Sequence, residues 1–147
     1  MELLDLYSFT ERNNIKIMSY NLETLNAVTI KLDKYFIGIN KNIIKSEKAE
    51  KLILAHEIGH CMTDHFYFLK DINNPLYKQN IEKVYKQNIE KAEREADDYA
   101  ISLLVSPEEI IQAQNKFNND AEIAEELNIS ITLLRKAVGY YKRKNLL

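Results

Sequence analysis

Apolar positions change along the chain from a two-residue period to a helical period, and this change predicts the order of the elements. In the first forty residues the pattern predicts a helix over 2–12, a short strand at 15–17 and a β-hairpin over 27–40. From residue 46 onward the apolar residues fall at helical spacing, with turn-forming segments such as 71–75 between them. Helices are therefore expected from residue 46 to an end between 64 and 70, and over 88–105, 107–114, 120–127 and 131–143. The pattern predicts an α+β fold with a small sheet first and helices after it.

Composition and charge are those of an ordinary globular protein. Of the 147 residues, 46% are hydrophobic and 29% are charged, and the formal net charge is −2. This charge argues against a dominant electrostatic attraction to nucleic acid. Cys61 is the single cysteine, so no internal disulfide can form. The first residues lack the features of a signal peptide, and no apolar run reaches membrane-spanning length. We expect a single domain in the cytoplasm.

The segment from Leu52 to His60 contains the pattern His-Glu-x-x-His. On a helix, His56 and His60 lie one turn apart on the same face, where both imidazoles can reach one metal ion. Glu57 lies between them and can act on a water molecule bound to that ion. Zinc is commonly bound by two imidazoles and a third protein ligand, with a fourth position left open for water. The pattern also arises by chance in roughly one chain of this length in a few hundred. Neighbouring apolar residues argue against chance, because they place both histidines on the face expected to point inward: Ala49, Leu52 and Ile53.

A third ligand is expected from the helix over 88–105. Glu93 and Asp97 lie one turn apart on one face of this helix, together with the small residues Ala96 and Ala100. We prefer Glu93 as the ligand, with Asp97 accepting the free N–H of a liganding histidine. Glu95 would point about 160° away from Glu93, so both cannot bind the same ion. The alternative is that both acids of the pair are solvated and that Glu93 pairs with a nearby lysine or arginine.

A duplicated segment separates the two motifs. Residues 77–84 are repeated almost unchanged as 85–92, and two copies are too few to form a solenoid. We interpret the duplication as a helical extension that lengthens the connection between the motif helices. Near the first motif, Cys61 is interpreted as a packing residue and His65 as a surface histidine.

Together these segments resemble the ImmA/IrrE family of metallopeptidases. The resemblance rests on His56-Glu-Ile-Gly-His60 followed by Glu93-x-x-Ala-Asp97-x-Tyr99-Ala100-x-x-Leu103-Leu104-x-x-Pro107, and it extends to the ending Glu122-Ile-Ala-Glu-Glu-Leu-Asn-Ile-Ser130. It implies a thermolysin-like zinc core with a small antiparallel sheet or hairpin, two motif helices and a helical C-terminal subdomain. The corresponding segments are 1–45, 46–106 and 107–147.

The resemblance also implies a function. Members of the family are often encoded in phages and mobile elements, and they cleave or inactivate a helix-turn-helix repressor. Carried over to this chain, His56, His60 and Glu93 bind Zn²⁺, Glu57 is the general base and Asp97 orients a histidine. The residue that stabilises the oxyanion stays open among three candidates: Tyr67, His65 and Tyr99. The chain departs from the family pattern in Tyr99, where phenylalanine is common, in Val105–Ser106, and in the duplicated insert, which could alter substrate access.

Two other classes of function are consistent with the sequence. Residues 120–143 resemble a helix-turn-helix, and the tail Lys142-Arg143-Lys144 is basic, which would suit DNA. The second helix begins with the mostly apolar Ile131-Thr132-Leu133-Leu134, however, which favours packing or repressor docking over DNA contact. The other class is a non-catalytic anti-repressor that keeps the zinc and acts by stoichiometric binding.

Overall fold

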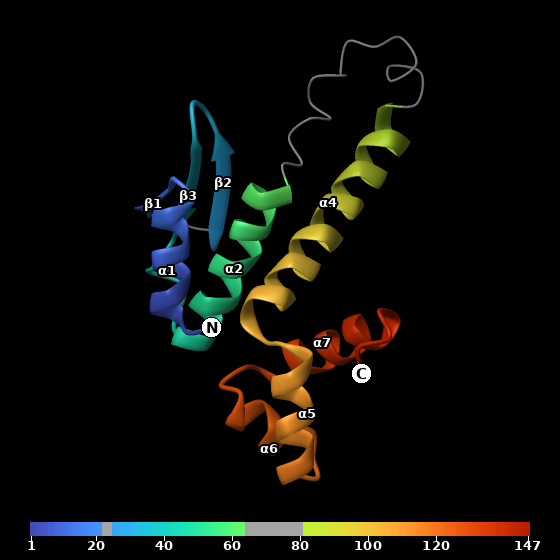
Figure 1. Ribbon diagram of the computed structural model, residues 1–147. Coiled ribbons are helices and arrows are strands. Elements are labelled where there is room, and N and C mark those ends of the chain that lie inside the picture. Colours follow the sequence, from blue (N-terminus) through green and yellow to red (C-terminus); the bar gives the residue numbers. More distant parts are fainter. Residues whose placement is uncertain (22–24, 64–80) are drawn as a thin grey trace.

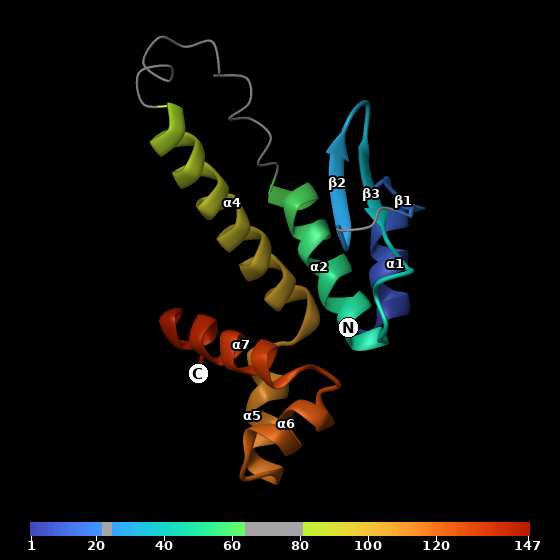
Figure 2. The ribbon, with the colours of Figure 1, turned by 180° about the vertical axis from the view of Figure 1, so that it is seen from behind.

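The computed structural model describes residues 1–21, 25–63 and 81–147, with 81–86 described by their backbone alone. Figure 1 shows the elements in chain order: α1 (Leu3–Arg12), β1 (Ile15–Ser19), β2 (Ala27–Lys31), β3 (Tyr35–Ile39), α2 (Glu47–Thr63), α4 (Ile81–Leu104), α5 (Pro107–Lys116), α6 (Asp120–Glu126) and α7 (Ile131–Arg143). The α+β class predicted from the pattern is confirmed. Figures 1 and 2 show α2 between the sheet and α4, with the last three helices gathered beyond the end of α4.

The sheet has the strand order β1-β3-β2. The predicted hairpin is present, because β2 and β3 pair antiparallel with Ala27 opposite Ile39 and Lys31 opposite Tyr35. The third strand makes the sheet mixed rather than wholly antiparallel, since β1 joins β3 in parallel. The direction of β1 follows from its connection to α1. After α1 the chain turns at Asn14, which has a φ of 55°, and continues directly into β1. Asparagine tolerates this left-handed conformation better than most residues. β2 is left as an edge strand.

The helices α1 and α2 cover one side of the sheet, with α1 on β1 and α2 on β2 and β3. The buried residues of β3, Ile37 and Ile39, are fully enclosed and belong to the same apolar cluster as Leu54 and Ile58 of α2. The core therefore lies between the sheet and α2 and continues along α4. Within the described residues, no helix is both long and apolar enough to cross a membrane.

The buried stripe of α2 differs from the one expected. Leu54, Ala55 and Ile58 are fully enclosed, whereas the residues expected on the inward face, Ala49, Leu52 and Ile53, are only partly buried. The side chains of His56 and His60 retain 21% and 15% exposure. The prediction that His56 and His60 lie on the inward face of the helix was wrong. They lie at the border of the buried stripe, where they face α4 and stay accessible.

The helices α2 and α4 approach each other closely at Gly59. A Cβ atom added at Gly59 would lie 2.5 Å from the carbonyl oxygen of Ala96, so only glycine fits here. Ala96 and Ala100 are themselves buried, as expected for helices in close approach. This contact brings the backbones of the two helices together near the motif histidines.

The last three helices begin at side-chain caps. Ser106 accepts a hydrogen bond from the Glu109 backbone, and Asn119 and Ser130 cap the next two helices in the same way. The start of each helix is as predicted, and α5 continues two residues past the expected end. Lys51 ties this group to α2, because its buried Nζ donates to the Asn128 carbonyl at 3.3 Å.

Several predictions lie outside the described residues. They concern the end of the first motif helix at 64–70, the loop at 71–75, and part of the duplicated segment. The second copy, 85–92, lies within α4, in agreement with a helical extension.

The close contact at Gly59 makes a stability prediction with a matched control. Gly59→Ala should lower the free energy of unfolding by about 1–3 kcal/mol, because the new methyl group meets backbone that cannot give way. In Gly139→Ala the new Cβ meets, among the described residues, only a flexible arginine at 3.5 Å, so this change should raise stability by about 0.5–1 kcal/mol. Urea unfolding of both variants is the measurement. Equal stabilities would contradict the packing described here.

Candidate metal centre

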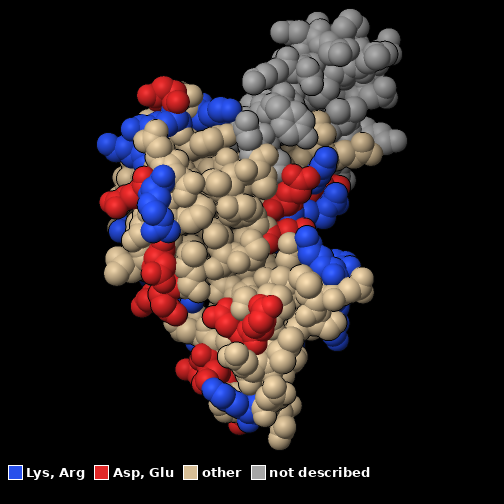
Figure 3. All heavy atoms as spheres, in the orientation of Figure 1, with Lys and Arg blue, Asp and Glu red and all other residues tan. Residues whose placement is uncertain are grey.

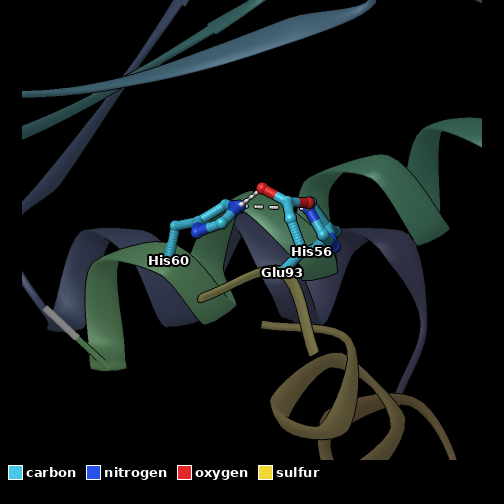
Figure 4. Close-up of side chains that lie close together, drawn as sticks. All are labelled: His56, His60 and Glu93. Carbon is cyan, nitrogen blue, oxygen red and sulfur yellow. Dashed lines mark hydrogen bonds and ion pairs between the residues drawn. The ribbon is translucent and has the colours of Figure 1, made fainter. Parts of the chain in front are cut away.

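The helices α2 and α4 bring three of the predicted site residues together. Figure 4 shows His56 and His60 from α2 pointing toward the carboxylate of Glu93 from α4. The carboxylate lies between the imidazoles, with Oε2 at 3.0 Å from His56 Nε2 and Oε1 at 3.1 Å from His60 Nε2. The two Nε2 atoms are 3.1 Å apart. One ligand atom from each residue therefore falls within a group spanning 4.8 Å.

The chemistry of this group fits a metal ion. Two imidazole nitrogens and one carboxylate oxygen form a donor set that zinc uses when a fourth position is left for water or substrate. Ligand atoms about 2.0–2.1 Å from a tetrahedral zinc are themselves about 3.4 Å apart, close to the separations found here. Both histidine side chains keep some exposure to solvent, which leaves a path to the site. His56, His60 and Glu93 could thus hold one metal ion.

Asp97 lies on the other side of the His56 ring. Its Oδ1 is 2.8 Å from His56 Nδ1, which makes Nδ1–H the donor and leaves the Nε2 lone pair facing Glu93. This is the arrangement expected for Asp97 from the sequence. The outer oxygen, Oδ2, lies 3.9 Å from Lys136 Nζ on α7, a contact that the sequence did not predict.

Glu93 and Glu95 separate as the helix geometry predicts. The Glu93 carboxylate lies about 3 Å from both histidines, and this position replaces the alternative of a pair with a lysine or arginine. Glu95 lies 3.7 Å from Lys91 Nζ and outside the metal-binding group. The separation follows from the rotation between positions two residues apart on a helix.

Glu57 is held by the edge strand of the sheet. The hydroxyl of Thr29, on β2, donates a hydrogen bond to the Glu57 carboxylate. Sequence reasoning missed Thr29, because alternation shows that it faces one side of the sheet but not which helical residue it meets. The contact places the β2 edge directly beside the motif helix, and it fixes the direction of the Glu57 side chain.

The structure does not decide among the three residues predicted as candidates for stabilising the oxyanion. His65 and Tyr67 lie outside the described residues. Tyr99 packs against the core, and burial raises the pKa of its hydroxyl.

Cys61 follows a motif histidine but is turned into the core. It is 4% exposed, and burial, with a smaller effect from the negative charge of Glu57, raises the pKa of its thiol to about 12. This agrees with the interpretation of Cys61 as a packing residue, because a nucleophilic cysteine needs a lowered pKa and access to solvent.

The burial of Cys61 predicts low reactivity. At pH 8 the folded protein should react with a disulfide reagent at least about a hundredfold more slowly than the urea-unfolded chain, because the thiol is protonated and enclosed. The absorbance of the released thiolate measures both rates. Equal rates would show that Cys61 is accessible and would remove the packing interpretation.

Comparison with known families agrees with this geometry. The family model described as the IrrE N-terminal-like domain, Peptidase_M78, matches residues 10–138. The match spans most of the chain and includes both motifs. A search of curated proteins and a search of solved structures each returned no match. The resemblance seen in the sequence is therefore confirmed, and the chain belongs to the IrrE N-terminal-like family of peptidases.

Proposed function

We propose that this protein is a zinc-dependent, site-specific protease that hydrolyses a peptide bond in a regulatory protein, a helix-turn-helix repressor, and so relieves repression. One observation carries the proposal: two imidazoles and a carboxylate converge within 4.8 Å, beside the acid of the same motif. The family match supports a metallopeptidase. We also propose that the protein is located in the cytoplasm, where it would meet a repressor.

The residues of the site have separate roles in this mechanism. His56, His60 and Glu93 would hold the zinc, which supplies Lewis-acid chemistry and makes water nucleophilic at neutral pH. Glu57 takes the proton of the attacking water on its carboxylate and returns it to the nitrogen of the leaving amine. Thr29 keeps that carboxylate oriented through its hydroxyl, and Asp97 keeps His56 in the tautomer that presents Nε2.

The edge strand β2 is suited to hold an extended substrate. Hydrogen bonds from Asn40 N to Asn26 O and from Leu32 N to Lys34 O mark the bonded pairs of the hairpin. By the alternation of antiparallel pairing, the backbone groups of Ala27, Thr29 and Lys31 then face away from β3. A peptide added to this edge would lie next to the strand position that contacts Glu57. Figure 3 shows a broad surface with few charges over β2 and α2, which suits an ordinary polypeptide.

The C-terminal helices are better suited to packing than to DNA contact. Leu133 and Leu134, at the start of α7, are buried. The preceding helix α6 exposes four acids, and three of them pair with a basic side chain that could otherwise meet a phosphate. The four are Asp120, Glu122, Glu125 and Glu126. We therefore propose a protein partner and no direct nucleic-acid binding.

Glu57→Gln tests the proposal. Co-expressed with tagged helix-turn-helix repressors, the wild-type chain should shorten one of them, and Glu57→Gln should lower the cleavage rate by about 10²–10⁴-fold through loss of the general base. The variant should still bind zinc, because its three ligands are intact. Glu90→Gln, an exposed acid on α4, is the matched control and should cleave as the wild type does.

Two outcomes would contradict a proteolytic function. Glu57→Gln could relieve repression as fully as the wild type, or the wild type could relieve it while the repressor stays intact. Either result would favour stoichiometric binding of the repressor.

A further inference from the structure

A charged groove lies between α4 and α7, and Asp97 separates it from the metal centre. Its volume is about 690 Å³, within the range of cavities that bind ligands in proteins. Five basic side chains line it: Lys91, Arg94, Arg135, Lys136 and Arg143. In Figure 3 basic and acidic side chains gather side by side where α4 and α7 approach each other. Of the residues that line the groove, the proposed protease mechanism uses Asp97.

The arginines of the groove are not all engaged. Arg135 Nε lies 3.1 Å from Asp120 Oδ2, and Lys136 Nζ lies 3.9 Å from Asp97 Oδ2. Arg94 and Arg143 form no ion pair with any of the residues that the structure describes. Both are exposed. A guanidinium group in this state is available for an anionic ligand, and its planar fork of N–H donors matches a carboxylate.

Gly139 is the second observation that points to a ligand. It lies inside α7 and lines the groove, where glycine costs about 1 kcal/mol relative to alanine. The described part of the fold does not require it, because the one side chain there that an added Cβ would meet is the Arg143 guanidinium, at 3.5 Å. At Gly59, by contrast, the backbone of Ala96 excludes any side chain. Gly139 keeps the groove open beneath Arg143.

The other wall of the groove limits the kind of anion. Glu95, Asp97 and Asp98 of α4 also line it, and they would repel the closely spaced phosphates of a nucleic acid. A polypeptide can instead space its carboxylates to meet the arginines and present neutral residues to these acids. We propose that the groove is a docking site for an acidic segment of a partner protein, with its carboxylates on Arg94 and Arg143 and its backbone passing over Gly139.

The groove and the metal centre share Asp97. One oxygen of this carboxylate contacts His56 and the other faces Lys136 in the groove. A protein docked there would be held behind the motif histidine, on the side of the ring away from Glu93. The docking site does not depend on hydrolysis, so it can be tested on a chain that has no protease activity.

Fluorescence anisotropy with the full-length Glu57→Gln protein tests this site. The probe is a labelled 12-residue peptide of alternating Glu and Ala, with a Gln-Ala peptide and a 12-nucleotide oligothymidylate for comparison. The Glu-Ala peptide should bind, and Arg94→Gln/Arg143→Gln should weaken it about tenfold through loss of two charge-assisted contacts. The control Lys16→Gln/Lys34→Gln replaces one lysine on β1 and one in the turn between β2 and β3, and it should change binding by less than about twofold.

A second variant distinguishes binding in the groove from general electrostatic attraction to the protein. Gly139→Gln leaves every charge in place and fills the floor, so it should weaken the peptide about fivefold or more without lowering the melting temperature. Normal binding by Gly139→Gln would overturn the proposal, as would equal losses in the two double variants. Tighter binding of oligothymidylate than of the Glu-Ala peptide would assign the groove to nucleic acid instead. No binding by any probe would remove the site altogether.

Discussion

The metal centre depends on how closely the backbones of α2 and α4 approach each other. Gly59 lies against the carbonyl of Ala96, where a Cβ atom would come within 2.5 Å. This approach lets a side chain as short as Glu93 place one oxygen about 3 Å from each histidine. The same approach brings Asp97, one turn further along α4, to the opposite nitrogen of His56. A wider separation of the helices would break both contacts.

Much of this site follows from local rules. The spacing of His56 and His60 needs only the pitch of a helix, and so does the choice of Glu93 over Glu95. The starts of α5, α6 and α7 follow from serine and asparagine caps whose hydrogen bonds the structure contains. For these features each deciding interaction lies within a few residues along the chain.

Contacts between distant segments were not predictable in the same way. The parallel pairing of β1 with β3 and the bond from Thr29 to Glu57 join elements whose relative placement no periodicity encodes. The prediction of which face of α2 is buried was wrong for a related reason. Apolar residues indicate that a helix packs against something. Which of its faces becomes buried depends on the neighbouring elements, and α2 packs against both the sheet and α4.

If His56, His60 and Glu93 form one metal site, the metal content of the protein should depend on Glu93. Elemental analysis would compare the wild type with Glu93→Ala and Glu95→Ala, each purified without chelator and dialysed against limiting zinc. We expect close to one zinc per chain in the wild type and Glu95→Ala, and a clear loss in Glu93→Ala. Zinc-free wild type, or equal zinc in all three proteins, would contradict this expectation.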